Sequence, residues 1–243
     1  MVYTIQRKTS GYELTFNYTE LTLDCIMALR KSISDRLSSV DIDVSIVRGD
    51  SDICMIINAD NLEPLSTAIK REQTDSDKYK LMVQVIYALS NQLIHVIDKA
   101  KYCFYNYTME DVMIVNGGKT AFYISPHLLK ITYSPTKNYT YMNIYSFPEH
   151  QKNIFASPEL SNLSELPAKL PVSAIFWSMG MLVIRGFLIN MPIEHFNRTS
   201  SRQLLAQCNR IKGTRLYNML VHCVEPNHRL RTINWGDRVV NRY

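Results

Sequence analysis

Residues 102–115, YCFYNYTMEDVMIV, contain carboxylate and amide side chains whose types and spacing could serve metal binding or acid–base catalysis. Glu110 and Asp111 are adjacent carboxylates, and carboxylate oxygens are the ligands that Mg²⁺ prefers. Asn106, five residues before Asp111, carries no charge and cannot act as a general base. Two neighbouring acids in a loop are more often solvated than bound to a metal. The stretch therefore predicts either a weak metal site at Glu110 and Asp111 or a loop without chemistry.

Two predicted elements position this stretch. Before it, residues 79–98 carry apolar side chains on one face at helical spacing, which predicts a long amphipathic helix. After it, two short apolar runs at residues 112–115 and 121–124 flank the sequence NGG, a typical hairpin turn. Residues 125–158 show no clear periodicity, and helical patterns then continue to the end of the chain.

The first sixty residues are richer in strand patterns. Residues 2–9 and 12–19 are β-rich and are separated by a Ser-Gly turn signal. Residues 23–37 place apolar side chains at helical spacing, and two further short strands are predicted in residues 41–49 and 52–59. The predicted fold class is therefore α+β.

Composition limits the class of protein. The 243 residues are 46% hydrophobic and 20% charged, which is sufficient for a substantial core. The five cysteines are scattered and lack CxxC spacing, which argues against a zinc site or a disulfide framework. The N-terminus has no apolar signal region, so a reducing, cytoplasmic-type compartment is expected. Residues 175–193 approach membrane-spanning length, but Arg185 and Pro192 favour a buried helix over a membrane span.

Basic residues are concentrated near the C-terminus. Residues 198–243 hold nine Lys and Arg side chains against two acidic ones, a net charge of +7, which leaves −2 for the rest of the chain. Such a face can bind an acidic protein or nucleic acid. The simpler interpretation is a solvated helix surface, because the sequence contains no nucleic-acid-binding motif.

The order of these elements resembles the protein kinase fold. The passage ICMIINADNLEPLSTAI is similar to the strand, hinge and following helix that connect the two kinase lobes. Four residues fall at the hinge, where kinases hold adenine: Ile57, Asn58, Ala59 and Asp60. The resemblance implies a two-lobed fold, with a reduced, strand-rich N-lobe in residues 1–60 and a helical C-lobe in residues 61–243.

The catalytic motifs of that family are replaced in this chain. Kinases follow the long helix with a loop, H-R-D-x-K-x-x-x-N, and end the next hairpin with D-F-G. The family's His, catalytic Asp, Lys and metal-binding Asn fall on Phe104, Asn106, Thr108 and Asp111, and the D-F-G aspartate falls on Ser125. Phosphoryl transfer needs a base and carboxylates that hold Mg²⁺, and neither Asn106 nor Ser125 supplies one. The N-terminal region also lacks a G-x-G-x-x-G loop.

Structural landmarks of the family are better kept. FASPEL resembles the A-P-E motif, IFWSMGMLV resembles the D-x-W-S-x-G start of a buried helix, and VEPNHRLR resembles the late D-P-x-x-R motif. In kinases the A-P-E glutamate and the late arginine form a buried ion pair, which the resemblance assigns to Glu159 and Arg229. Loss of one partner would leave the other charge stranded.

Structural motifs kept and catalytic motifs replaced are typical of a pseudokinase. The resemblance implies a catalytically inactive, regulatory protein that needs no cofactor. It would bind a protein partner, such as an active kinase or an assembly subunit, as a scaffold or decoy. The Tyr-, Asn- and Ile-rich composition is similar to that of degenerate kinase homologues of large DNA viruses, which implies host cytoplasm or virion as the location.

Two alternatives stay open. The chain is an atypical phosphotransferase if Asp111 or Glu110 holds a metal ion. It is a nucleic-acid-associated subunit if the basic C-terminal segment binds RNA or DNA. Residues 125–159 correspond to the kinase activation segment, and the tyrosines between positions 133 and 145 predict either phosphorylation by another kinase or an aromatic loop that packs on a partner.

Overall fold

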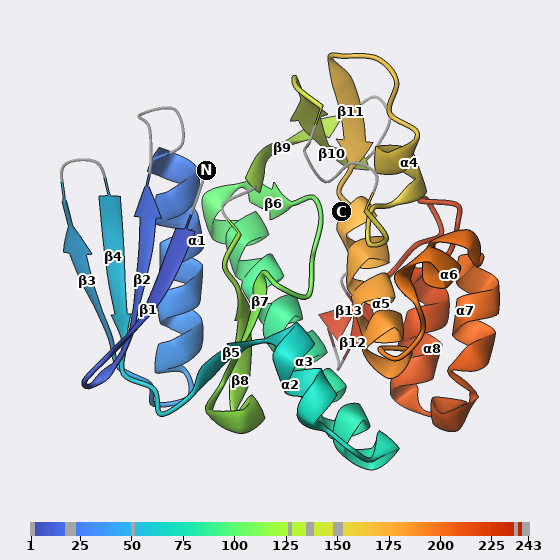
Figure 1. The fold of residues 1–243 in the computed structure, drawn as a ribbon. Coiled ribbons are helices and arrows are strands. Elements are labelled where there is room, and N and C mark those ends of the chain that lie inside the picture. The colour runs from blue at the N-terminus through green and yellow to red at the C-terminus, as the bar shows by residue number, and fades with distance from the viewer. Residues whose placement is uncertain are drawn as a thin grey trace.

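The computed structural model describes residues 3–17, 23–49, 52–125, 128–134, 139–147, 153–235 and 238–239. The chain is α+β, as the sequence predicts. Its N-terminal part is an antiparallel sheet in the order β1-β2-β4-β3, beside which helix α1 lies (Figure 1). These elements are β1 (Tyr3–Lys8), β2 (Gly11–Asn17), α1 (Leu23–Ser38), β3 (Val44–Arg48) and β4 (Asp52–Ile57).

Alternation of polar and apolar residues forms this sheet. Every second side chain of β2 and β4 is buried, as expected for strands with one face in the core. Helix α1 contributes side chains at helical spacing to the same core, namely Ile26, Leu29, Ile33 and Leu37. The strands and helix predicted for the first sixty residues are therefore confirmed within the described ranges.

The long helix α3 (Asp75–His95) lies at the centre of the molecule (Figure 1). The Thr74 hydroxyl accepts a hydrogen bond from the Asp77 amide and begins the helix, and a π-helical turn, Val96–Ala100, extends it. A three-stranded sheet in the order β5-β7-β8 packs nearby. It comprises β5 (Leu62–Pro64), β7 (Val112–Val115) and β8 (Thr120–Tyr123), and α2 (Leu65–Arg71) follows β5. The predicted hairpin is confirmed, with β8 beginning one residue earlier than expected.

The side chain of Gln92, on α3, connects three elements. Its amide nitrogen donates to the Ser32 hydroxyl at 3.1 Å and to the Tyr123 carbonyl at 3.0 Å. Its amide oxygen accepts from the Tyr123 amide at 2.7 Å. Gln92 is 1% exposed, so both ends of a buried amide are satisfied and α1, α3 and β8 are held together.

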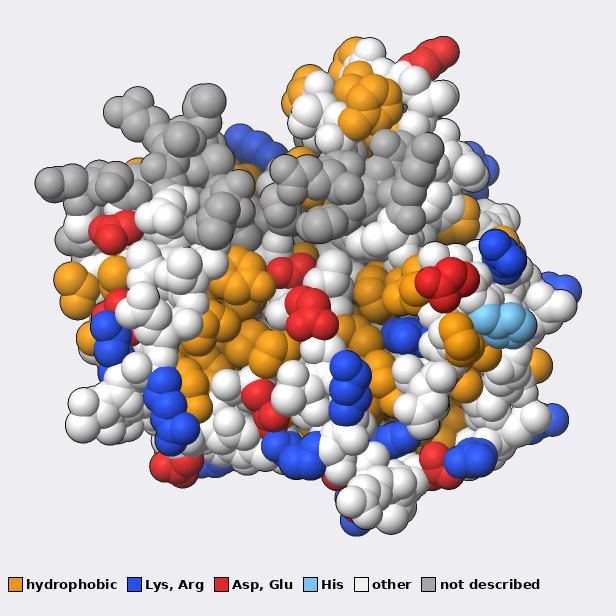
Figure 2. Space-filling model, viewed as in Figure 1, with side chains coloured by type: hydrophobic (Ala, Val, Ile, Leu, Met, Phe, Trp, Pro, Cys, Tyr) orange, Lys and Arg blue, Asp and Glu red, His pale blue; other side chains and the backbone are white. Residues whose placement is uncertain are grey.

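A second four-stranded sheet, in the order β11-β10-β9-β6, projects at the top of Figure 1. Its strands are β6 (Tyr102–Phe104), β9 (Leu128–Ser134), β10 (Tyr139–Ile144) and β11 (Ala168–Pro171). The sequence shows no clear periodicity in residues 125–158, where β9 and β10 form, and it favours helix after residue 158, where β11 forms, so both expectations are wrong at these strands. β9 and β10 pair directly with each other, whereas β6 pairs with β9 and β10 with β11 across long intervening segments that no local pattern links. Figure 2 shows hydrophobic side chains gathered over this projecting part.

The remaining elements are mainly helical and lie together on one side of α3 (Figure 1). They are α4 (Pro158–Ser161), α5 (Ala174–Phe187), α6 (Ile193–Arg198), α7 (Ser201–Gln207), α8 (Arg215–Cys223), β12 (Asn234–Trp235) and β13 (Arg238–Val239).

Helix α5 is buried on nearly all sides, as the sequence predicts for residues 175–193. It is shorter than expected, because Arg185 donates to the carbonyls of Leu188 and Met191 and so closes the turn after the helix. Within the described ranges, one helix, Asp75–Ala100, is long and apolar enough by length and composition to cross a membrane. Of its most apolar window, 61% is buried inside the protein, as in a core helix.

Candidate functional site

Asp111, the residue at the position of the kinase metal-binding asparagine, is already hydrogen-bonded on both carboxylate oxygens. The Thr108 hydroxyl donates to Oδ2 at 2.6 Å and accepts from the Asp111 amide at 3.2 Å. The Tyr3 hydroxyl, on strand β1, donates to Oδ1 at 3.1 Å. Thr108 therefore acts as a local cap for the loop, while Tyr3 joins the first strand directly to it.

The Tyr3 hydroxyl is a fixed donor in this arrangement. Burial raises the pKa of Tyr3 well above its ordinary value, and the Asp111 carboxylate, which accepts its hydrogen bond, raises it further. Glu110 adds a smaller effect of the same direction. At neutral pH the phenol thus keeps its proton and its hydrogen bond to Asp111.

Asn106, at the position of the catalytic aspartate, is a structural residue. It is 4% exposed, and its side-chain oxygen lies 3.1 Å from the Ser178 hydroxyl on α5. The Tyr123 hydroxyl donates to the Asn106 carbonyl at 2.7 Å. Contacts from α5 and β8 therefore fix the loop from inside, and they give Asn106 no access to a substrate.

Aromatic rings fill the space beneath the loop. Phe104, at the position of the kinase histidine, is fully buried, and its ring centroid lies 4.7 Å from that of Tyr123 in an edge contact. Tyr107 makes an edge contact with Tyr123, also at 4.7 Å. Burial raises the pKa of both Tyr107 and Tyr123, so these phenols stay neutral. Phe104, Tyr107 and Tyr123 thus form an aromatic cluster that packs the loop from inside.

The metal ligands considered from the sequence do not gather into a site. Ser125, at the D-F-G aspartate position, is 2% exposed and hydrogen-bonds the Tyr123 hydroxyl. Glu110 is exposed, and Asp111 is held by Thr108 and Tyr3. Among the residues that the structure describes, no group of three or more His, Cys, Asp or Glu side chains is close enough to hold a metal ion. The two residues after Ser125 lie outside the described ranges.

The backbone donors of the predicted hinge are engaged within the chain. The Asn58 amide donates to the Asp43 carbonyl and the Ala59 amide to the Ile57 carbonyl, each at 3.0 Å. The Asp60 amide donates to the Asn116 side-chain oxygen at 2.9 Å, as does the Asn61 amide at 3.1 Å.

The three hinge amides thus have internal acceptors. A base that binds through them would have to replace existing bonds, because a backbone N–H has a single hydrogen. Ile57, the last residue of β4, is fully buried in the core.

The predicted ion pair between Glu159 and Arg229 is wrong, because Glu159 pairs with Arg231 instead. Arg231 donates to both carboxylate oxygens of Glu159, at 3.0 and 3.1 Å, and its guanidinium stacks 5.2 Å from the Trp177 ring centroid. Arg229 is exposed on the turn that follows α8. The turn carries the chain two residues further before it re-enters the core, so Arg231 and not Arg229 faces α4.

Arg231 is fully satisfied in the core. Besides Glu159, it donates to three backbone carbonyls, those of Ser173, Glu225 and Pro226. Burial raises the pKa of Glu159, but hydrogen bonds and the charge of Arg231 outweigh burial, so the pKa lies below its ordinary value. The pair therefore fastens the segment after α8 to the start of α4.

Sequence reasoning missed Tyr3 and Arg231. Tyr3 appears in the sequence only as one residue of a strand, and no local signal links it to a loop 108 residues away. Arg229 and Arg231 flank Leu230, so spacing alone could not choose between them.

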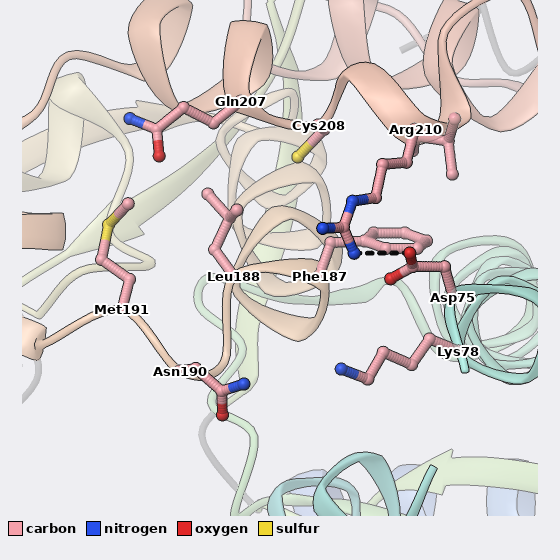
Figure 3. Close-up of a pocket in the computed structure, with 10 residues that line it drawn as sticks. Asp75, Lys78, Phe187, Leu188, Asn190, Met191, Gln207, Cys208 and Arg210 are labelled. Atoms are coloured by element: carbon pink, nitrogen blue, oxygen red, sulfur yellow. Dashed lines mark hydrogen bonds and ion pairs between the residues drawn. The ribbon is translucent and has the colours of Figure 1, made fainter. Parts of the chain in front are cut away.

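A cavity of about 420 Å³ lies between the start of α3, the end of α5 and the turn after α7 (Figure 3). Arg210, from the basic C-terminal segment, reaches across it to Asp75 at 2.6 Å. Lys78, one turn further along α3, points into the same space (Figure 3). Part of the basic charge is thus neutralised within the chain.

Comparison with protein-family models finds no match, and comparison with curated proteins finds no relative. The contacts of the chain's own residues are therefore the basis for a function.

Proposed function

We propose that the chain is a catalytically inactive, kinase-like protein that acts by binding another protein. The observation that carries the proposal is the hydrogen bonding of the hinge amides and of Asp111. Every backbone donor from Asn58 to Asp60, and both oxygens of Asp111, already have partners inside the protein. A kinase keeps these groups available for adenine and metal, so their engagement supports loss of nucleotide chemistry.

The arrangement of elements supports the kinase-like part of the proposal. Residues 1–60 correspond to a reduced N-lobe of one sheet and one helix, and residues 61–243 to a helical C-lobe. The hairpin β7–β8 directly follows the loop at residues 104–111, and Glu159 pairs with a late arginine, although this is Arg231, two residues after the position that the family motif assigns. Structural features of a kinase are thus matched while its reactive groups are not.

Exposed aromatic side chains support a role in protein binding. Tyr133, Tyr145 and Phe147 are 56%, 76% and 52% exposed on or beside β9 and β10. Aromatic residues are enriched in the cores of protein interfaces. The partner is an active kinase or a subunit of an assembly, in a reducing compartment. Phosphorylation of these tyrosines would add charge to the same surface.

The experiment that tests the proposal is a thermal shift with ATP, in the presence and absence of Mg²⁺. A ligand at a hundred times its Kd stabilises by about 2.7 kcal/mol, which raises the Tm by several degrees in a chain of this size. We expect no shift at millimolar ATP. A Mg²⁺-dependent rise would instead indicate a working nucleotide site, and turnover in a kinase assay that is lost in Asp111→Ala would then favour the atypical phosphotransferase.

A further inference from the structure

The cavity between the start of α3, the end of α5 and the turn after α7 has an apolar lining on one side (Figure 3). Phe187, the last residue of α5, and Leu188 lie across the back of the space, and Met191 and Ile211 complete the apolar part. Phe187, Leu188 and Met191 are only partly buried, so a ligand that covers them would remove apolar surface from water. The volume of about 420 Å³ lies within the range of about 300 to 1,000 Å³ that is typical of ligand pockets.

Lys78 brings to this cavity a cationic group that has no acidic partner in the part of the chain that the structure describes. Its side chain is partly buried and points into the space (Figure 3). Asp75, one turn earlier on α3, is engaged by Arg210 at 2.6 Å. Asp77, the acidic residue next to Lys78, pairs with Lys80 at 3.5 Å. The acids closest to Lys78 in sequence are therefore used elsewhere, and its ammonium group is left to bind an anion.

The charges of the lining determine the charge of that anion. Lys78 and Arg210 carry two positive charges and Asp75 one negative charge, so the lining has a net charge of +1. Burial raises the pKa of the Cys208 thiol to about 12, so this neighbour adds no charge at neutral pH. A carboxylate, with one negative charge, balances the lining. A phosphate monoester carries nearly two negative charges at neutral pH and would leave an excess.

Asn190 adds a polar group on the side opposite Lys78. Its amide group is exposed at the cavity and points across the space toward Lys78 (Figure 3). An amide nitrogen donates hydrogen bonds and an ammonium group does the same, so the two groups can share one carboxylate. An apolar lining with a small number of polar groups is typical of sites for small molecules.

We propose that this cavity binds a small monocarboxylate with an aliphatic or aromatic body. The carboxylate pairs with Lys78, and the apolar body covers Phe187, Leu188 and Met191. The inference goes beyond the proposed function and is independent of it, because it uses no residue of the hinge or of the loop at residues 104–111.

Calorimetric titration of the intact chain tests the ligand class. The probes are octanoate and 4-phenylbutanoate, which combine one carboxylate with an aliphatic or an aromatic body. Octanamide and 4-phenylbutanamide are the matched neutral controls, acetate is the control without an apolar body, and octyl phosphate is the control with greater negative charge.

We expect saturable binding of at least one of the two carboxylates at millimolar concentration. Its amide and acetate should bind at least about tenfold more weakly, since a tenfold loss corresponds to about 1.4 kcal/mol. Absence of saturable binding by both carboxylates, equal binding of the matched amide, or tighter binding of octyl phosphate overturns the proposal.

Two lysine variants assign the binding cation. Lys78→Gln keeps a long polar side chain without the charge and should weaken carboxylate binding by about tenfold or more, because a charge-assisted hydrogen bond is lost. Lys80→Gln makes the same change two residues further along α3, at an exposed lysine, and should alter the affinity by no more than about twofold. Unaltered affinity in Lys78→Gln, or equal losses in both variants, overturns the assignment to this cavity.

Nuclear magnetic resonance locates the apolar body of the ligand. The sequence has 11 methionines, and labelling of their methyl groups gives a signal for Met191 that is identified by its absence in Met191→Leu. We expect octanoate to shift the Met191 signal with the same saturation as the calorimetric titration. Binding that leaves this signal unchanged places the ligand outside the cavity and overturns the proposal.

Discussion

Tyr3 and Asp111 are 108 residues apart in the sequence, and the hydroxyl of the first donates to the carboxylate of the second at 3.1 Å. This bond joins the edge strand of the N-terminal sheet to the loop where a kinase would hold metal. Asp111, which would otherwise be the strongest candidate for a metal ligand, thus holds strand β1 against this loop.

Removal of the Tyr3 hydroxyl should weaken the attachment of β1 to the loop, and we expect no catalytic activity to result. Tyr3→Phe leaves the ring and loses a hydrogen bond to a charged, partly buried group, so we expect the free energy of unfolding to fall by about 1 to 2 kcal/mol. Thermal unfolding measures the loss, and Tyr145→Phe is the control because that side chain is 76% exposed. A larger effect of the control would contradict the importance of the bond.

Introduction of an aspartate at position 106, where the proposed kinase resemblance expects one, should not create activity. In Asn106→Asp a carboxylate replaces a buried amide that is 4% exposed, which should lower the free energy of unfolding by about 1 to 3 kcal/mol at neutral pH. Asn58→Asp makes the same change at an exposed position and should be nearly neutral. Transfer of labelled phosphate from ATP is expected to be absent in both variants, because Ser125 still supplies no carboxylate. Turnover in Asn106→Asp would overturn the view that the site is lost at several positions.

The corrected ion pair can be tested by comparing two arginines. Arg231→Ala leaves the Glu159 carboxylate without its bidentate partner, and we expect a loss of about 3 kcal/mol or more in the free energy of unfolding. Arg229→Ala removes an exposed side chain, so it should change this free energy by no more than about 0.5 kcal/mol. Denaturant unfolding of both variants decides between them, and equal losses would argue against the pairing with Arg231.

The same pair predicts a dependence of stability on acid. The pKa of Glu159 is lower in the folded protein than its ordinary value of 4.5, because the hydrogen bonds and charge of Arg231 exceed the effect of burial. The unfolded chain therefore binds the proton more readily, and the stabilisation is complete above pH 4.5 and declines as the pH falls through the lower folded pKa.

Glu159→Gln provides the measurement of that dependence. The difference in free energy of unfolding between the wild type and this variant should be constant from about pH 7 to 8 and should shrink below about pH 4.5. A difference that grows in acid would reverse the assigned direction of the pKa shift.

Local patterns in the sequence were sufficient for much of the fold. The helical spacing before the loop predicted α3, and the NGG turn predicted the β7–β8 hairpin, since in both cases the forming contacts are close in sequence. Strands β9 to β11 were missed: β9 and β10 pair directly but no turn signal was recognised between them, and β10 meets β11 only after a long intervening segment.

The sequence identifies the residue types at the candidate site but not the contacts that hold them. Asn106 and Ser125 are read directly from the sequence, and the proposal that they replace a base and a metal-binding carboxylate rests on the kinase resemblance. The partners that hold the loop, Tyr3 and Ser178, come from β1 and α5 and are brought there only by tertiary packing. The contacts that hold this loop are therefore ones that no motif encodes.

The side chain of Gln92 has a consequence for the behaviour of the protein at high concentration. Strand β8 ends its sheet, and the Tyr123 amide and carbonyl on its open side are both bonded to the Gln92 amide group, which imitates the peptide of another strand. An unpaired edge is a template on which strands from other molecules can add. At Tyr123 the backbone amide and carbonyl are already bonded to Gln92, so a strand from a neighbouring copy cannot pair with the edge at this residue.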